Sequence, residues 1–210
     1  MFPEWVIQAD RDVPTGLQFH TLRTMPASIF SALLPIHVPQ VRTILRSWFA
    51  RDPALVIDAT AHVGVDTLNW RYLFPTSPIW AYETDEATCQ ALSSNVSGKG
   101  IDVRHDTCLH LTLPPTEDVV TSIVHRARTV LYVDPPWGPS YAQQASVPLR
   151  LDGHDAFDWA TSYLDKGVTD VVIKVPFNVQ AWEGPYTVSK ATVYQPSGRV
   201  AYGLWRIQSV

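Results

Sequence analysis

Short apolar strand-like segments alternate with helix-like segments between residues 55 and 175, and no other feature constrains the fold as strongly. Strands are predicted at 55–58, 79–83, 101–105, 129–133 and 171–175, and helices at 67–73, 86–96 and 156–164. Such alternation produces a mostly parallel sheet covered by helices. Two further strands, 186–194 and 199–207, are joined by Gln195-Pro196-Ser197-Gly198, which is a hairpin signal. We therefore predict an α/β fold whose seven-stranded sheet ends in an antiparallel hairpin.

The first 52 residues are predicted to form a short helical extension of this core. Residues 1–24 are expected to be irregular, because turn-favouring Asp, Pro and Gly residues are spread through them. A short helix is predicted over 26–34. A longer one is predicted to begin at Pro39, with Arg42 and Arg46 on its flank, because apolar residues follow at helical spacing. The remaining residues, 53–210, are expected to form one compact domain.

Composition excludes several classes of protein. Hydrophobic residues make up 46% of the chain and charged residues 17%, as in ordinary globular proteins. A net charge of −4 argues against a broadly basic surface that coats nucleic acid. Cys89 and Cys108 lack metal-ligand spacing, so we expect neither a metal site nor a disulfide scaffold. With no leader and no membrane-length apolar run, the sequence predicts a soluble intracellular protein, and it indicates no oligomeric state.

Residues directly after the predicted strands are the candidates for a ligand site, since ligands bind beyond the carboxyl ends of parallel strands. The first strand leads into the segment from Asp58 to Thr67, in which Gly64 allows the chain to pass close to a flat ligand. Glu83 ends the second strand, where an acid typically accepts hydrogen bonds from a ribose diol. Asp106 follows the third strand and is placed to accept from an adenine amino group.

Asp134-Pro135-Pro136-Trp137 follows the strongly apolar fourth strand directly and is the strongest functional signal in the chain. The two prolines remove backbone donors and leave carbonyl acceptors, and the Asp134 carboxylate adds another. Together these oxygens form an acceptor-rich rim that suits an exocyclic NH₂ group, while Trp137 offers a face on which a base can stack. Catalysis at such a rim would depend on proximity and orientation, with Asp134 helping charge to leave the nitrogen. The alternative is an ordinary Asp-Pro turn with Trp137 in the core.

Both segments resemble motifs of class I S-adenosylmethionine-dependent methyltransferases, particularly the trimethylguanosine synthase-like group. The first motif of that group reads Asp-x-Phe-x-Gly-x-Gly-Gly-x-Thr, and the second reads Pro-Pro-Trp-Gly-Gly-Pro-x-Tyr. The resemblance implies S-adenosylmethionine as cofactor, RNA with a possible 5′ cap as substrate, and Asp134, Pro135 and Pro136 as catalytic residues. The implied substrate-binding residues are Trp137, Tyr141, Lys174 and Asn178. The implied cofactor-binding residues are Asp58, Thr60, His62, Gly64, Thr67, Glu83, Asp106 and Asp134.

The sequence departs from these motifs in ways that bear on the prediction. His62 stands in place of the first glycine and Val65 in place of the last. His is one of the few non-glycine residues enriched at positive φ, which would retain the turn. Asp134 occupies a position where the cellular cap enzymes have Ser, and the second motif is one residue shorter here.

Lys174 emerges from the apolar fifth strand and should reach solvent, an acid or the site. The pattern Lys174-x-Pro176-x-Asn178 resembles the corresponding segment of the same group. A lysine here that pairs with an acid after the fourth strand also resembles the ribose 2′-O-methyltransferases, which use two lysines, an Asp and a Glu. No lysine precedes Lys99, so we rank ribose methylation lower.

The predicted function is methylation of an exocyclic purine amine in RNA, with the N2 atom of a cap guanosine as the first candidate. Methylation of adenine N6 in RNA or DNA would use the same acceptor rim. A catalytically inactive methyltransferase fold that serves as a binding subunit is the alternative of another class. The substitution at His62 keeps that alternative open.

Overall fold

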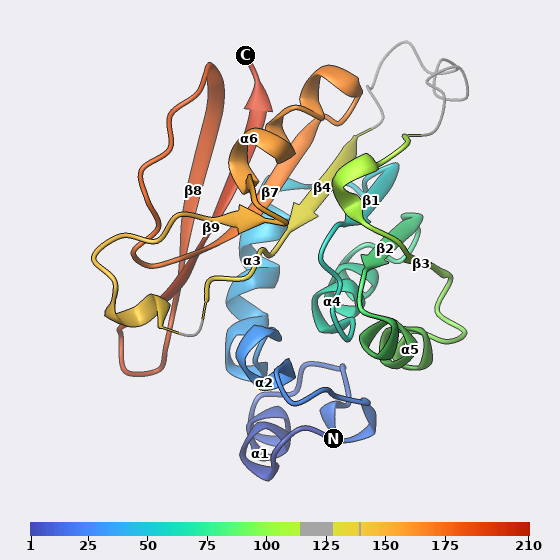
Figure 1. Cartoon of the computed structure of the whole chain (residues 1–210). Coiled ribbons are helices and arrows are strands. Elements are labelled where there is room, and N and C mark those ends of the chain that lie inside the picture. Colours follow the sequence, from blue (N-terminus) through green and yellow to red (C-terminus); the bar gives the residue numbers. More distant parts are fainter. Residues whose placement is uncertain (114–127, 139) are drawn as a thin grey trace.

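The computed structural model describes residues 1–113, 128–138 and 140–210, and a seven-stranded sheet forms its centre (Figure 1). The strand order is β3-β2-β1-β4-β7-β9-β8. The first five strands in this order are parallel, and β9 is antiparallel to both β7 and β8. The bounds are β1 (Leu55–Asp58), β2 (Ile79–Glu83), β3 (Ile101–His105), β4 (Thr129–Val133), β7 (Asp170–Pro176), β8 (Tyr186–Tyr194) and β9 (Val200–Ser209).

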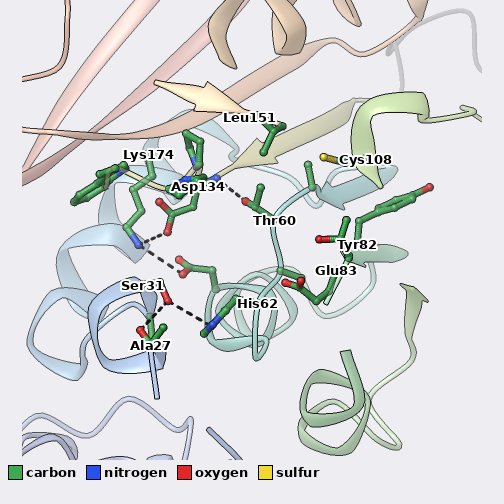
Figure 2. A pocket seen from close by; sticks show the side chains of 18 of the residues that line it. Ala27, Ser31, Thr60, His62, Tyr82, Glu83, Cys108, Asp134, Leu151 and Lys174 are labelled. Atoms are coloured by element: carbon green, nitrogen blue, oxygen red, sulfur yellow. Dashed lines mark hydrogen bonds and ion pairs between the residues drawn. The ribbon is translucent and has the colours of Figure 1, made fainter. Parts of the chain in front are cut away.

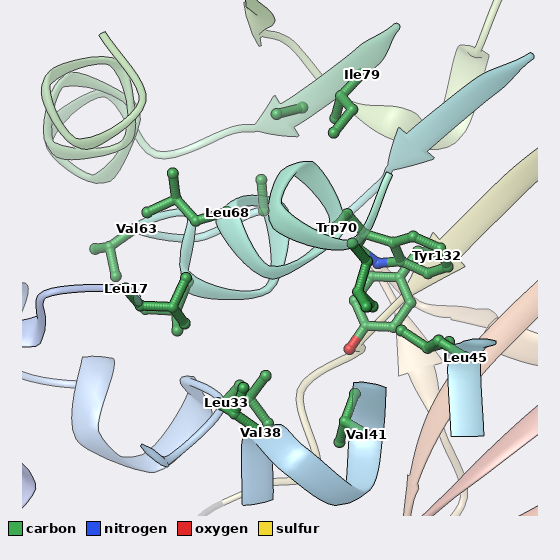
Figure 3. Close-up of a cluster of buried hydrophobic side chains, with 14 of the residues drawn as sticks. Leu17, Leu33, Val38, Val41, Leu45, Val63, Leu68, Trp70, Ile79 and Tyr132 are labelled. Carbon is green, nitrogen blue, oxygen red and sulfur yellow. The ribbon is translucent and has the colours of Figure 1, made fainter. Parts of the chain in front are cut away.

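Helices cover both faces of the sheet. Successive residues of each strand point to opposite faces, so neighbours in one strand contact different helices. Val56 of β1 packs with α3 (Val38–Trp48), α4 (Val65–Leu73), α5 (Glu86–Asn95) and the N-terminal extension. Its neighbour Ile57 packs with α6 (Ala156–Thr161) on the other face. The first of these clusters includes Trp70 and Tyr132, whose rings meet edge to face (Figure 3). The order of strands reverses between β1 and β4, which places the expected ligand site there.

The predicted fold class is confirmed, and four of the five central strands have the predicted bounds. The fifth, β7, is one residue longer at each end. The predicted helix over 156–164 ends earlier, at Thr161, and a 3-10 turn (Leu164–Lys166) follows it. The division of the chain at residue 52 stays a prediction.

The prediction that residues 1–24 are irregular is wrong. Helix α1 (Glu4–Asp12) forms there, and its Val6 and Ile7 are buried in the core beside the extension's Phe2 and Phe19. Burial of this apolar face stabilises a segment whose composition alone suggested turns. The helix expected over 26–34 is shorter and comprises only α2 (Ser28–Ser31), with 3-10 turns at Phe19–Thr21 and Pro35–His37 on either side.

A small hairpin between β4 and α6 was not predicted. It consists of β5 (Arg150–Leu151) and β6 (His154–Asp155), joined by Asp152 and Gly153. Both linking residues have positive φ, 47° and 86°. An Asp-Gly pair with this backbone is the usual two-residue hairpin turn, so a signal was present in the sequence.

Candidate active site

A cavity of about 630 Å³ opens at the carboxyl edge of the sheet (Figure 2). Small-molecule sites typically measure about 300–1,000 Å³, so this one can hold a cofactor-sized ligand. Residues that follow β1, β2, β3 and β4 line it, together with α2, the β5–β6 hairpin and Lys174 of β7. Of the predicted site residues, those that line it are Thr60, His62, Glu83, Asp134, Pro135, Pro136, Trp137, Tyr141 and Lys174.

The loop from β1 to α4 is held by a buried carboxylate. Asp58 accepts hydrogen bonds from Thr67 Oγ1 at 2.6 Å and from the Thr60 backbone N at 3.3 Å. Burial raises the pKa of Asp58 to about 7. Asp58, Gly64 and Thr67 do not themselves line the cavity. They fix the shape of the loop that presents Thr60 and His62 to it.

Two residues with left-handed backbone conformations determine the path of this loop. His62 has φ 49° and Gly64 has φ 89°. His62 therefore adopts the conformation for which the motif has glycine, and the turn is retained, as predicted from the tolerance of His for positive φ. A Cβ on Gly64 would lie 2.6 Å from Leu92 Cδ1 of α5, so only glycine fits there without movement. His62 Nδ1 lies 3.4 Å from Ser31 Oγ of α2, which brings the N-terminal extension to the cavity (Figure 2).

The far end of the cavity differs from what was expected. Glu83 lines it, as predicted, and its Oε1 accepts from the Asp85 backbone N at 2.9 Å. Asp106 is exposed, accepts from the Thr107 backbone N at 2.7 Å and does not line the cavity. The wall there comes instead from residues that were not predicted to belong to the site: Tyr82, Cys108, Leu151 and Asp152.

The segment after β4 is tied directly to the β1–α4 loop. The Asp134 backbone N donates to Thr60 Oγ1 at 2.7 Å. Trp137 lines the cavity, with its ring centroid 5.1 Å from that of Tyr141 and the two planes at 75°. Asn178 does not line the cavity; its side-chain amide donates to the carbonyls of Tyr141 and Gln144, and so holds the segment after Trp137. Pro139 lies outside the described residues.

Lys174 lies between two carboxylates at the floor of the cavity (Figure 2). Its Nζ is 2.7 Å from Asp134 Oδ2 and 3.8 Å from Asp66 Oδ2, and its side chain is 5% exposed. Burial raises the pKa of Asp134 to about 6; Lys174 opposes the shift and Asp66 adds to it. Burial opposes the charge on Lys174, but Asp134 and Asp66 hold its pKa above the usual value.

Asp66, which sequence reasoning missed, also accepts from Tyr132 Oη at 3.0 Å. One sequence signal was available: a lysine in an apolar strand requires acids nearby. The two carboxylates and one ammonium make a group of net charge −1. No cluster of three or more His, Cys, Asp or Glu residues suited to a metal ion occurs in the part of the chain that the structure describes. No helix in that part is long and apolar enough to cross a bilayer.

Solved structures share this architecture. A candidate RNA methyltransferase from Pyrococcus horikoshii is similar with a TM-score of 0.58 and 13% identity, over 95% of this chain and 98% of that one. The chain has the class I methyltransferase fold. TrmN from Thermus thermophilus is similar with a TM-score of 0.56 and 18% identity, over 88% of this chain and 51% of that one.

A third methyltransferase-fold structure was solved with a bound ligand. This candidate methyltransferase from Streptococcus mutans, in complex with S-adenosylhomocysteine, has a TM-score of 0.50 and 14% identity, over 82% of this chain and 97% of that one. The sequence matches no protein-family model and no curated protein. The resemblance to the trimethylguanosine synthase-like group stays a prediction.

Proposed function

We propose that this protein is an S-adenosylmethionine-dependent methyltransferase that modifies an exocyclic amine of an RNA base. One observation carries the proposal. The acceptor segment from Asp134 to Trp137 and the loop from β1 to α4 line one cavity, and the hydrogen bond from the Asp134 backbone N to Thr60 Oγ1 joins them. The fold likeness supports the reaction class, and the similar protein from Pyrococcus horikoshii is described as a candidate RNA methyltransferase.

The composition of the cavity fits the cofactor. Glu83 at the end of β2 offers a carboxylate to a ribose diol, and Tyr82 and Leu151 supply aromatic and apolar surface for an adenine. Thr60 and His62 are assigned to the methionine end, next to Asp134. S-adenosylmethionine supplies an electrophilic methyl group when it is bound. Asp58 and Thr67 are buried and contribute to cofactor binding indirectly, because their hydrogen bond holds the loop from β1 to α4.

The acceptor side is assigned to the segment from Asp134 to Trp137. Asp134 and the carbonyl oxygens of Pro135 and Pro136 accept hydrogen bonds from the amine and orient its nitrogen. Trp137 stacks on the base. As the nitrogen is methylated it gains positive charge and then loses a proton, which Asp134 is placed to accept. The net charge of −1 on Asp66, Lys174 and Asp134 favours an acceptor atom that becomes positive.

Ribose 2′-O-methylation is the second candidate, and the Lys174–Asp134 pair is the observation that favours it. A hydroxyl acceptor develops negative charge as it loses its proton, so a cation beside it helps and two carboxylates oppose it. The amine therefore ranks first. Guanosine N2, including that of a cap, follows from the motif resemblance, and adenine N6 is the alternative base position.

Product analysis tests the proposal. The protein is incubated with S-adenosylmethionine and RNA, with and without a cap, and the digested nucleosides are identified by mass spectrometry. N2-methylguanosine is the expected product. N6-methyladenosine would move the assignment to the other amine, and a 2′-O-methylated nucleoside would overturn it. If calorimetry detects no heat with millimolar cofactor, the result would favour the alternative of a non-catalytic binding subunit.

Two variants separate the roles of the acceptor segment. Asp134→Ala is expected to lose turnover while it retains cofactor binding. Trp137→Ala is expected mainly to raise the KM for RNA. The matched control is Trp5→Ala, because Trp5 is 55% exposed on α1 and does not line the cavity. An unchanged KM in Trp137→Ala would exclude stacking by this residue.

A further inference from the structure

A second cavity, of about 680 Å³, lies between the N-terminal extension and the outer parts of α4 and α5. Residues 16–18 and 21–23 of the extension form one wall. Leu68, Arg71 and Tyr72 of α4 form another, and residues at the end of α5 and in the turn after it form the third. We call this cavity the basic cleft, after the charge of its lining.

The charged residues in the lining of the basic cleft are all cationic. Arg23, Arg71 and Lys99 line it, and no Asp or Glu of residues 1–113, 128–138 and 140–210 does. None of the three forms an ion pair with a carboxylate among the described residues. In a chain with net charge −4, three uncompensated cations around one cavity do not reflect the average surface. Such a lining attracts anions.

Hydrogen bonds hold the guanidinium of Arg71 and the backbone of Arg23 in place. Arg71 Nη1 donates to the Pro75 carbonyl at 2.9 Å, and Nη2 donates to the Gly100 carbonyl at 2.8 Å. The backbone of Arg23 is bonded at both N and O to the side chain of Asn95, at 2.7 and 2.9 Å. Ser94 and Ser97 add hydroxyl groups to the same lining. Cationic side chains and hydroxyl groups that share one cavity are suited to phosphate oxygens.

The basic cleft adjoins the candidate active site. Asn95, which lines the cleft, donates through Nδ2 to the carbonyl of Val63 at 2.8 Å, and Val63 lines the active-site cavity. One hydrogen bond therefore joins the walls of the two cavities.

We infer that the basic cleft binds backbone phosphates of the RNA substrate next to the methylated nucleotide. The inference rests on the proposed RNA substrate and adds the surface that holds the strand. Phosphate contacts of this kind position a nucleic acid without reading its sequence, whereas Trp137 and Asp134 address the base. The expected contribution is to RNA affinity and its salt dependence, and not to cofactor binding.

The test compares two double variants that change the net charge equally. Arg23→Glu with Lys99→Glu reverses the two exposed cations of the cleft. Arg51→Glu with Arg199→Glu is the control, because both residues are exposed and line neither cavity. Affinity for a labelled mixed-sequence RNA oligonucleotide is measured by fluorescence anisotropy across a salt series. Cofactor affinity is measured by calorimetry, and circular dichroism confirms that each variant is folded.

The cleft variant is expected to bind RNA about tenfold more weakly at low salt, and its salt slope should fall by about 0.7 for each phosphate that the variant no longer neutralises. Its cofactor affinity should equal that of the wild type. Equal weakening in both variants, or wild-type affinity and slope in the cleft variant, would overturn the inference. If the wild type binds RNA through the cleft but methylates none, the inference stands and the proposed reaction fails. If inorganic phosphate binds the cleft and RNA does not, the cleft is a free-anion site and the inference fails.

Discussion

Lys174 Nζ donates a hydrogen bond of 2.7 Å to Asp134 Oδ2, which joins the centre of β7 to the acceptor segment after β4. Both side chains are largely buried, at 5% and 12% exposure, and Asp66 Oδ2 lies 3.8 Å from the same ammonium. The buried ammonium holds the two carboxylates in place. Loss of either partner is costly, because it leaves a desolvated charge. The group therefore orients the Asp134 carboxylate and modifies its pKa, which burial raises.

Asp134 should impose an acid limb on the reaction. Its pKa is raised to about 6, mainly by burial, and the proposed role requires the ionised form. Activity, measured as kcat/KM for RNA, should therefore rise with pH through about 6. Asp134→Asn should lower turnover about a hundredfold or more and remove this limb, with unchanged cofactor affinity. The pKa of about 6 lies between pH 5 and pH 8, so a wild-type kcat/KM that stays constant over this range would contradict the assignment.

Asp66 should act as a positioning residue through Asp134. Burial is the main reason for the raised pKa of Asp134, but the negative charge of Asp66 adds to it. Asp66→Asn should therefore move the acid limb of kcat/KM to lower pH while it lowers kcat. Tyr132→Phe is the matched control, because it removes the donor at 3.0 Å from Asp66 and keeps the charge. If both variants leave the limb in place, Asp66 has only a structural role.

Gly64→Ala should destabilise the protein. The residue has φ 89°, and a Cβ would lie 2.6 Å from Leu92 Cδ1 and 3.2 Å from Val96 Cγ1. Left-handed strain and overpacking together should lower the free energy of unfolding by roughly 2–4 kcal/mol, measured by urea denaturation. The comparison is His62→Gly, whose φ of 49° glycine adopts freely, so its unfolding free energy should stay within about 1 kcal/mol of the wild type. Equal stability of the two variants would contradict this reasoning.

His37 should make the protein less stable in acid. Burial, and then the charge of Lys174, lowers its pKa to about 4, and its ring packs edge to face on Tyr202 at 5.3 Å. The unfolded chain binds a proton near pH 6.5 and the folded one only near 4, so stability is lost as pH falls through this window. His37→Phe should remove this loss, which amounts to a few kcal/mol. Urea titrations across the window measure it, and parallel stability curves for the two proteins would contradict the prediction.

Much of the fold was predictable because its signals are local. The bounds of β1, β2 and β4 follow from apolar runs that end at acids, and β3 shows the alternation of apolar and polar residues that is typical of a strand. The acceptor segment was located for the same reason, since Asp134 directly follows an uninterrupted apolar strand. Helix α1 was missed because its stability comes from burial of Val6 and Ile7 against distant residues, and not from its own composition.

Sequence alone determined which residues follow the parallel strands, and hence that Thr60, Glu83 and Asp134 would meet at one edge. Only the tertiary structure decided what surrounds them. Lys174 reaches Asp134 across 40 residues of chain, and Thr60 bonds to Asp134 across 74, because the strand order places β1, β4 and β7 side by side. The physical reason is the distance along the chain over which each feature is determined. Apolar periodicity is a property of residues close together in sequence, whereas ion pairs and cavity walls depend on which strands lie side by side.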